Sequence, residues 1–108
     1  MKLVIAVVQD QDATDAIQAL NDAGYRVTRV ASTGGFFSEG NTTLLCGVDD
    51  DAVPNVLDIL KHTCEQRTRL IPAGPNIVES AAMMGAFAEV KVGGATIFVL
   101  DVEHFEQS

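Results

Sequence analysis

The sequence predicts an α+β sandwich with the element order βαββαβ, in which the last strand is extended into a hairpin. Runs of β-branched residues alternate with two stretches of helical periodicity, and glycine and proline mark the connections. The chain has 108 residues, enough to bury one core without disulfides, so we expect residues 1–108 to form a single domain. This order is the ferredoxin-like arrangement, in which two helices cover one face of a sheet.

A buried strand and a helix are predicted to open the chain. LVIAVVQ (residues 3–9) is apolar at odd and even positions alike, which is typical of a strand covered on both faces. Asp12 is expected to cap the following helix, and Gly24 is expected to end it in a left-handed conformation. The apolar face of this helix is predicted to contain Ile17, Leu20 and Ala23.

Two paired strands and a second helix are predicted next. YRVTRVAST (25–33) has the mixed polarity of a strand, and NTTLLCGV (41–48) is its expected antiparallel partner. Asp51 is expected to cap the helix that follows, with Pro54 tolerated in its first turn. The apolar stripe of this helix is predicted to consist of Val53, Val56, Leu57, Leu60 and Cys64.

The last third of the chain is predicted to contain a long loop and a hairpin. TRLIPAGPN starts as an extended segment and breaks at two prolines and a glycine, and VESAAMMG has no clear periodicity, so residues 72–84 are expected to form a loop. AFAEVKV and ATIFVLDV then flank Gly93 and Gly94, a pair that favours tight hairpin turns. We expect these two strands to pair with each other.

The strand composition also predicts self-association. Two helices can cover only one face of the sheet, yet LVIAVV and TIFVL are apolar at odd and even positions alike. The opposite face must therefore be kept from water, and another copy of the chain is the simplest cover. We expect a closed homo-oligomer, with a ring of three as the first hypothesis.

Composition limits the possible partners. The 15 acidic and 7 basic residues give a formal charge of −8, which repels DNA and RNA, although local donors can still hold a small anion. The apolar run Leu3–Val8 is too short for a signal peptide or a membrane span, so a cytoplasmic protein is expected. Cys46 and Cys64 lie in apolar surroundings without CxxC spacing and are expected to be reduced core residues.

Neither catalysis nor metal binding is expected. Thr33 and Ser38 have no neighbouring base, and neither cysteine has an evident histidine partner. His62 and His104 have no cysteine or carboxylate at ligand spacing apart from surface acids. The sequence Gln9–Asp12 is explained by a strand end and a helix cap. No catalytic residue, metal ligand or cofactor is therefore predicted.

A polar patch is predicted on the pair of strands at 25–33 and 41–48. A period of two places Arg26 and Thr28 on one side of the first strand, and Asn41, Thr43 and Gly47 on one side of its partner. A guanidinium can fork onto a phosphate, an amide can recognise an adenine edge, and a glycine lets a base approach the backbone. These groups are compatible with a nucleotide site.

The connector TGGFFSEGN (33–41) has an unusual composition, because Phe36 and Phe37 lie among glycines and hydroxyl groups. Successive N–H groups in TGG can hold an anion, and the two rings offer a stacking surface for bases. The same glycines also fit simple turns, and the rings also fit an oligomer interface. The segment contains neither a Walker motif nor GxGxxG.

Three segments together resemble the P-II-like cyclic di-AMP receptors. They are VVQDQD, YRVTRVASTGGFFSEGNTTLLCGVDDD and VGGATIFVLDVEHFEQ, which occur in that family's order and spacing. The resemblance extends over residues 1 to about 71 and 88 to 107. It implies a homotrimer of ferredoxin-like subunits related in fold to the nitrogen regulatory P-II proteins, with a cyclic dinucleotide held in each cleft between neighbours. It also implies a non-enzymatic signalling role that acts through an unidentified regulated protein.

The resemblance assigns ligand contacts to the second strand and the connector. Carried over by position, Arg26 and Thr28 would contact phosphate, and Gly35 and Phe36 would line the base pocket.

The remaining implied contacts come from the third strand and the C-terminus. Asn41 and Gly47 would recognise adenine, and Gln107 would reach in from the adjoining subunit. Together these seven positions are the expected ligand-binding set.

One segment departs from the family pattern. Where the family has a serine-proline and a methionine-glycine-glycine loop ending in tyrosine-proline, this chain has PAGPNIVESAAMMGAF, within residues 72–87. Met83 and Met84 fit either a soft lid over the ligand or packing within the trimer. Two alternatives to a cyclic di-AMP receptor stay open: a receptor for another adenine nucleotide, and an interaction module that docks onto a protein through the Gly/Phe connector.

Overall fold

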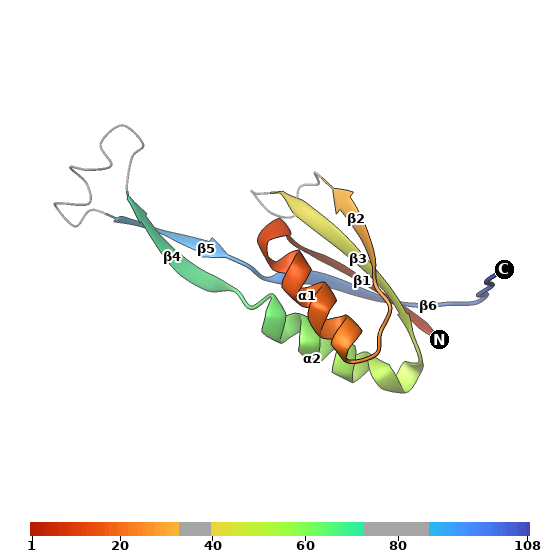
Figure 1. Cartoon of the computed structure of the whole chain (residues 1–108). Coiled ribbons are helices and arrows are strands. Elements are labelled where there is room, and N and C mark those ends of the chain that lie inside the picture. Colours follow the sequence, from red (N-terminus) through yellow and green to blue (C-terminus); the bar gives the residue numbers. More distant parts are fainter. Residues whose placement is uncertain (33–39, 73–86) are drawn as a thin grey trace.

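The structure, a computed structural model, describes residues 1–32, 40–72 and 87–108, with side chains described at 1–30, 40–70 and 91–108. It contains a four-stranded sheet of order β2-β3-β1-β6, two helices and a separate two-stranded ribbon, β4-β5 (Figure 1). The elements are β1 (Lys2–Gln9), α1 (Asp10–Asp22), β2 (Thr28–Ser32), β3 (Asn41–Val48), the short 3₁₀ helix η1 (Asp50–Ala52), α2 (Val53–Thr63), β4 (Arg67–Pro72), β5 (Phe87–Val92) and β6 (Ala95–Asp101).

The predicted mixed α+β fold is confirmed, and its sheet is compatible with the ferredoxin-like arrangement. β1 lies in the centre and pairs antiparallel with β3 on one side and β6 on the other. The predicted pairing of the strands at 25–33 and 41–48 is also confirmed, because β2 pairs antiparallel with β3. Both helices lie on the same face of the sheet (Figure 1).

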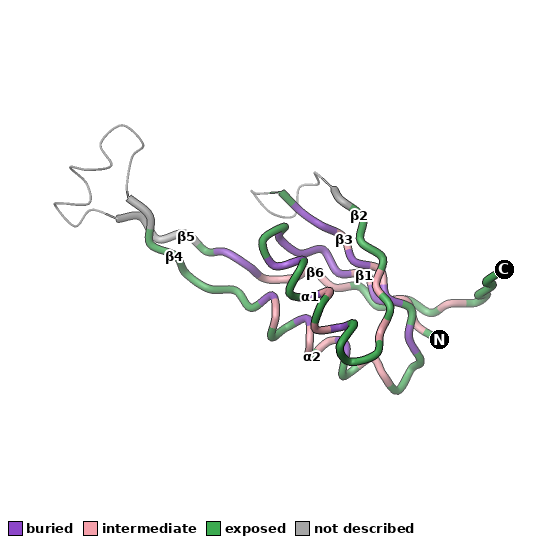
Figure 2. Tube along the Cα trace, in the orientation of Figure 1, coloured by how far each residue is buried: buried purple, intermediate pink, exposed green. Residues whose placement is uncertain are grey.

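The hydrophobic core lies between that face and the two helices. Alternate residues of β1 point into it, and α1 and α2 each add one apolar stripe. Its largest apolar side chains are at most 1% exposed, and they are Leu20, Leu44, Leu60, Val4, Val8 and Val56. The purple segments of Figure 2 follow this layer, whereas the tip of β6 and most of the C-terminal segment are green.

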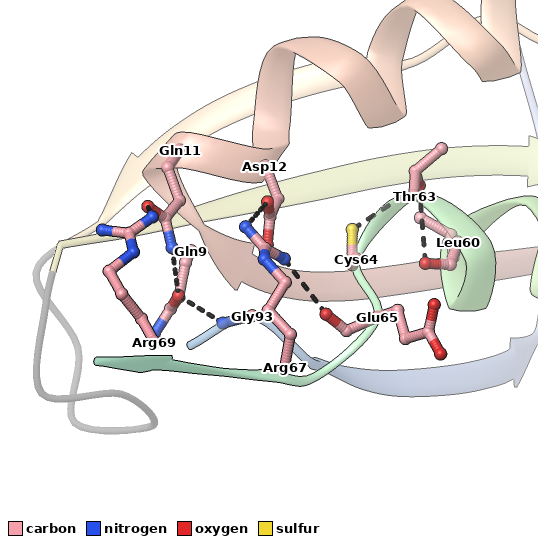
Figure 3. A network of polar contacts seen from close by, with 10 residues as sticks. All are labelled: Gln9, Gln11, Asp12, Leu60, Thr63, Cys64, Glu65, Arg67, Arg69 and Gly93. Atoms are coloured by element: carbon pink, nitrogen blue, oxygen red, sulfur yellow. Dashed lines mark hydrogen bonds and ion pairs between the residues drawn. The ribbon is translucent and has the colours of Figure 1, made fainter. Parts of the chain in front are cut away.

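The predicted cap of α1 is wrong. The helix begins at Asp10 after Gln9, which makes no capping hydrogen bond with its side chain. Asp12 is buried and forms an ion pair with Arg67 of β4, with 2.9 Å between carboxylate and guanidinium (Figure 3). A tertiary contact with a cation 55 residues away in the sequence thus replaces the local cap. Gly24 ends the helix region with φ +92°, as predicted.

The apolar face of α1 is shifted from the predicted one. Ala13, Ala16 and Leu20 are buried, Ile17 is half-buried, and Ala23 is exposed after the helix has ended. The predicted stripe extended to Ala23, but the helix ends one residue earlier, at Asp22.

The second helix begins two residues after the predicted cap. Asp51 lies inside η1 and makes no cap, because the chain first forms this 3₁₀ turn and α2 then starts at Val53. Pro54 lies in the first turn as expected. Of the predicted stripe, Val56, Leu60 and Cys64 are buried, and Val53 and Leu57 are half-buried.

The predicted C-terminal hairpin is wrong. β5 pairs with β4, from Arg67↔Val92 to Pro72↔Phe87, and β6 pairs with β1 in the main sheet. Gly93 and Gly94 adopt positive φ angles, but they connect the ribbon to the sheet instead of closing a turn. Their N–H groups donate to the Gln9 side chain and to the Cys64 carbonyl, which docks this junction onto the body. The predicted loop 72–84 lies outside the described residues apart from Pro72, which belongs to β4.

The face of the sheet opposite the helices, here called the open face, carries large apolar side chains. Strand pairing sets Leu3 beside Leu100 and Ile5 beside Phe98 on this face. Phe98 is 46% exposed and Leu100 is 49% exposed. The two-sided apolar pattern of the strands thus corresponds to one face in contact with the helices and one face that the described chain leaves accessible.

Both cysteines are free and buried, and burial raises the pKa of each thiol. Because alkylation requires the thiolate and access to sulfur, we expect iodoacetamide to modify Cys46 and Cys64 about 100-fold or more slowly in the folded protein than in concentrated urea. Mass spectrometry of quenched time points measures both rates. Equal rates in buffer and in urea would show that the thiols are accessible in the native state.

Candidate functional site

A hollow of about 390 Å³ lies on the open face, where β2, β3, the start of β1 and the C-terminal segment meet. Its apolar wall includes Leu3, Leu45 and Phe105. Its polar wall contains Arg26, Thr28 and Gln107. The volume falls within the range of small-molecule sites in proteins, and such sites combine an apolar lining with a few polar groups.

Strand pairing explains why these side chains meet. Thr28 of β2 lies opposite Leu45 of β3, and Leu3 of β1 lies opposite Gly47 of β3. Directly opposed residues of an antiparallel pair share a face, and period two keeps alternate positions on it. Arg26, two residues before Thr28, extends the same row. The hollow is therefore a direct result of strand register.

Gly47 leaves a gap at the centre of this arrangement. It lies inside β3, where glycine weakens a strand, and it is not among the glycines with positive φ. A Cβ built on Gly47 would meet no atom within 4 Å. Neither backbone conformation nor packing of the described chain requires a glycine here. A side chain at this position would instead project into the hollow, so the glycine is what keeps the hollow open.

A second hollow of about 400 Å³ adjoins the first at Met1, Arg26 and Gly47. It continues towards Tyr25, whose hydroxyl accepts a hydrogen bond of 2.9 Å from the Asn55 side chain. Arg26 is exposed and lines both adjoining hollows.

The N-terminus forms part of the wall between the hollows. Its ammonium group lies 3.0 Å from the Asp50 carboxylate, and this hydrogen-bonded pair lowers the pKa of Asp50 below its usual value. The Met1 carbonyl accepts a hydrogen bond of 3.2 Å from the N–H of Val102. The first residue is thus tied to both η1 and the C-terminal segment, which brings Phe105 and Gln107 to the hollow.

Four of the seven predicted ligand residues line this hollow: Arg26, Thr28, Gly47 and Gln107. Gln107 lines the hollow of its own chain, and its contribution to an adjoining subunit stays a prediction.

The other three predicted residues do not line the hollow or are not described. Asn41 begins β3 at the end of the strand away from Gly47, and it is 1% exposed. Gly35 and Phe36 lie outside the described residues.

Phe105 is a lining residue that was not predicted from the sequence. Its ring is 64% exposed and borders the hollow. The signal was present in the sequence, because Phe105 lies two positions before Gln107, and alternate residues of an extended segment point the same way. Met1 was missed for another reason, since no local pattern predicts where a terminus docks.

Two further findings concern metals and membranes. In residues 1–32, 40–72 and 87–108, no group of three or more His, Cys, Asp and Glu side chains is arranged to hold a metal ion. No helix in this described part of the chain is long and apolar enough to cross a membrane.

The whole chain, residues 1–108, matches the family described as cyclic-di-AMP receptor. The chain belongs to the cyclic-di-AMP receptor family. The resemblance predicted from the sequence is thereby confirmed, and the match includes the divergent segment 72–87. Membership in the cyclic-di-AMP receptor family supports a role in signalling with a small nucleotide as ligand.

The fold of this cyclic-di-AMP receptor family member is also similar to that of a solved structure. That structure is the crystal structure of a functionally unknown protein from Pediococcus pentosaceus ATCC 25745. The two chains are 38% identical and superpose with a TM-score of 0.78, over 99% of this chain and 96% of that chain.

Proposed function

We propose that this chain is a non-enzymatic receptor that binds cyclic di-AMP in the hollow around Gly47. The observation that carries the proposal is the glycine itself, because an open space bordered by Arg26 and Thr28 is left in a strand where packing does not require it. Family membership supplies the ligand class, and the hollow supplies a place of suitable size and chemistry.

Each side chain of the hollow has a distinct proposed role. The Arg26 guanidinium pairs with a phosphate, and the Thr28 hydroxyl donates a hydrogen bond to the same group. An adenine lies against the β3 backbone at Gly47, where a side chain would exclude it. The exposed ring of Phe105 stacks on a base, and the Gln107 amide offers a donor and an acceptor to its edge. Gly35, Phe36 and Asn41 are proposed to add further base contacts.

The proposed functional unit is a homotrimer. The hollow opens beside the apolar side chains of the open face, so a second copy that covers Phe98 and Leu100 also closes the mouth of the site. Each cleft between neighbours then holds one cyclic dinucleotide. The C-terminal segment, with Gln107, lies where such a neighbour would meet it.

The proposed signal is a change in the surface presented to another protein. Cyclic di-AMP favours one arrangement of the connector that contains Gly35 and Phe36, and the receptor thereby gains or loses affinity for an unidentified regulated protein. Ligand binding can shift this equilibrium only by its difference in affinity for the two arrangements. No covalent chemistry is involved.

Titration calorimetry with cyclic di-AMP tests the ligand, and a thermal-shift panel with cyclic di-GMP, ATP and AMP tests its specificity. Cyclic di-AMP is expected to raise the melting temperature by mass action. Arg26→Ala is expected to weaken binding about 10- to 100-fold, which corresponds to the loss of a charge-assisted hydrogen bond.

Arg29→Ala is the matched control, because Arg29 lies on the other side of β2 by strand parity. It should leave the affinity unchanged. A flat response to every nucleotide would reject the receptor and favour an interaction module without a small ligand. Equal losses in the two arginine variants would show that only overall charge matters.

A further inference from the structure

The corner between β1 and α1, residues Gln9 to Asp12, does more than end a strand and start a helix. Two of its side chains, Gln9 and Asp12, contact Gly93 and Arg67 at the base of the β4–β5 ribbon (Figure 3). A third, Asp10, contacts Thr42 at the start of β3. The corner therefore joins the ribbon to the end of β3 that begins with Asn41, which is the end away from Gly47.

The ribbon is fastened to the corner by two buried polar groups. The Gln9 side-chain oxygen accepts a hydrogen bond of 2.6 Å from the N–H of Gly93. The Asp12 carboxylate receives both terminal nitrogens of Arg67, at 2.9 Å and 3.3 Å (Figure 3). Gln9 is 4% exposed, and the Asp12 side chain is 6% exposed. A forked pair of this kind fixes orientation as well as distance.

Gly93 permits this close approach. Its φ of +83° disfavours any residue with a side chain, and a Cβ would come within 2.5 Å of the Glu65 carbonyl oxygen and 2.6 Å of the Arg67 guanidinium. Arg67 itself donates to that Glu65 carbonyl at 3.0 Å. The first residues of β4 and the residue after β5 thus converge on one point, where they meet Asp12.

The same corner holds the start of β3. The N–H of Asp10 donates to the Gly40 carbonyl at 3.0 Å, and the Thr42 hydroxyl donates to the Asp10 carboxylate at 2.6 Å. Between these two anchors lies Asn41, which pairs with Gln9 in the β1–β3 register. Asn41 is one of the expected ligand residues, and its partner Gln9 accepts the hydrogen bond from Gly93. One pair of opposed residues therefore links a proposed ligand contact to the ribbon.

The ion pair between Asp12 and Arg67 is expected to resist opening. The Asp12 carboxylate has little access to water, so withdrawing Arg67 would leave a buried, unpaired charge. Such a contact stays closed until the corner itself rearranges. The Arg67 side chain is 43% exposed, so the buried member of the pair is the carboxylate. A pair that resists opening keeps the base of the ribbon fixed to the corner, so that a shift of one is accompanied by a shift of the other.

We propose that the Gln9–Asp12 corner couples ligand contact at the start of β3 to the position of the β4–β5 ribbon. Gln9, Asp12 and Arg67 are positioning residues in this scheme, since none of them needs to touch the ligand. The inference rests on the proposed function, because it presumes a ligand near Asn41. Coupling is reciprocal, so loosening the ribbon must also weaken ligand binding by the same factor.

Amide hydrogen exchange of residues 68–70 and 91–92, with and without cyclic di-AMP, measures the coupling. In the wild-type chain, saturating ligand is expected to slow exchange of these ribbon amides by about 5- to 10-fold. Asp12→Asn removes the carboxylate charge and keeps the shape of the side chain. In this variant the ligand-induced slowing should fall below about twofold, and the affinity for cyclic di-AMP should drop by the same factor as the slowing. The quantity compared between wild type and variant is the ratio of exchange rates with and without ligand. A residue that only stabilises the fold would change both rates and leave this ratio unaltered.

Lys2→Gln is the matched control, because it removes an exposed ion pair with Asp101 elsewhere on the sheet. It should retain the full ligand-induced slowing. Arg67→Lys, which keeps the charge but loses the fork, gives the same comparison in case Asp12→Asn does not fold. Binding with equal slowing in wild type and variant would overturn the coupling alone. A wild-type chain that binds no cyclic di-AMP would overturn the proposed function, and this inference with it.

Discussion

Replacing Gly47 with leucine is expected to lower the affinity for cyclic di-AMP by about 100-fold or more, while the fold stays intact. The added side chain would occupy space in the hollow that Arg26 and Thr28 also line, where the ligand is proposed to lie. Forcing extra atoms into an occupied site costs about 1–3 kcal/mol or more. The leucine side chain would fill the space that the adenine is proposed to occupy, so the ligand could not bind there in another orientation. The loss should therefore exceed that of Arg26→Ala.

Stability should move in the opposite direction. A Cβ at Gly47 meets no atom within 4 Å, and removing a glycine from a strand interior stabilises by about 0.5–1 kcal/mol. Calorimetry gives the affinity, and urea unfolding gives the free energy of unfolding of the same preparations. Gly47→Ala should lie between wild type and Gly47→Leu in affinity.

Thr14→Leu is the control for an added apolar side chain, because Thr14 is exposed on α1 in the other layer of the fold. It should bind as wild type does. Undiminished binding by Gly47→Leu would place the ligand elsewhere. A fall in stability parallel to the fall in affinity would show that Gly47 serves folding.

Much of the site follows from local rules that a sequence contains. A period of two was enough to put Arg26, Thr28 and Gly47 on one face, because strand geometry fixes alternation whatever the surroundings. The same alternation assigned Gly47 to the face of its strand that contains Asn41 and Thr43. The register that brings Leu3 opposite Gly47 depends on pairing between distant strands, and it could not be derived from either strand alone.

The errors at Asp12 and at the two glycines have a common physical cause. An aspartate near a helix start has a local partner, the free N–H groups of the first turn, and the sequence reveals only that one. A guanidinium on β4 competes for it through a contact that no local pattern contains. Gly93 and Gly94 likewise satisfy either a tight turn or a junction, and the tertiary acceptors on Gln9 and Cys64 decide between them.

The composition of the strands predicts self-association for a different reason. Helices can bury one face of a sheet only, so apolar residues on the second face point to a surface that must be covered. The structure puts Phe98 and Leu100 on that second face, which also contains the hollow. A substitution near the end of β6 therefore tests the hypothesis of a homotrimer most directly.

Leu100→Asp is expected to convert the proposed trimer into monomers. Leu100 is 49% exposed in the single chain and lies beside Leu3, so in an assembly that covers the open face a carboxylate here would be buried without a partner. Burying an unpaired charge costs several kcal/mol, and a closed ring of three incurs that cost at every interface. The folded monomer should be nearly unaffected, because the side chain keeps its contact with water.

Sedimentation equilibrium distinguishes the states by mass, since one chain weighs 11.5 kDa and the assembly should weigh three times as much. Leu70→Asp introduces the same change on β4, where Leu70 is 61% exposed and lies outside the open face, and it should remain trimeric. Monomers are also expected to bind cyclic di-AMP more weakly, because each hollow then lacks the neighbour that closes its mouth. A wild-type chain that sediments as a monomer at every concentration, or a Leu100→Asp variant that keeps the wild-type mass, would remove the open face from the interface.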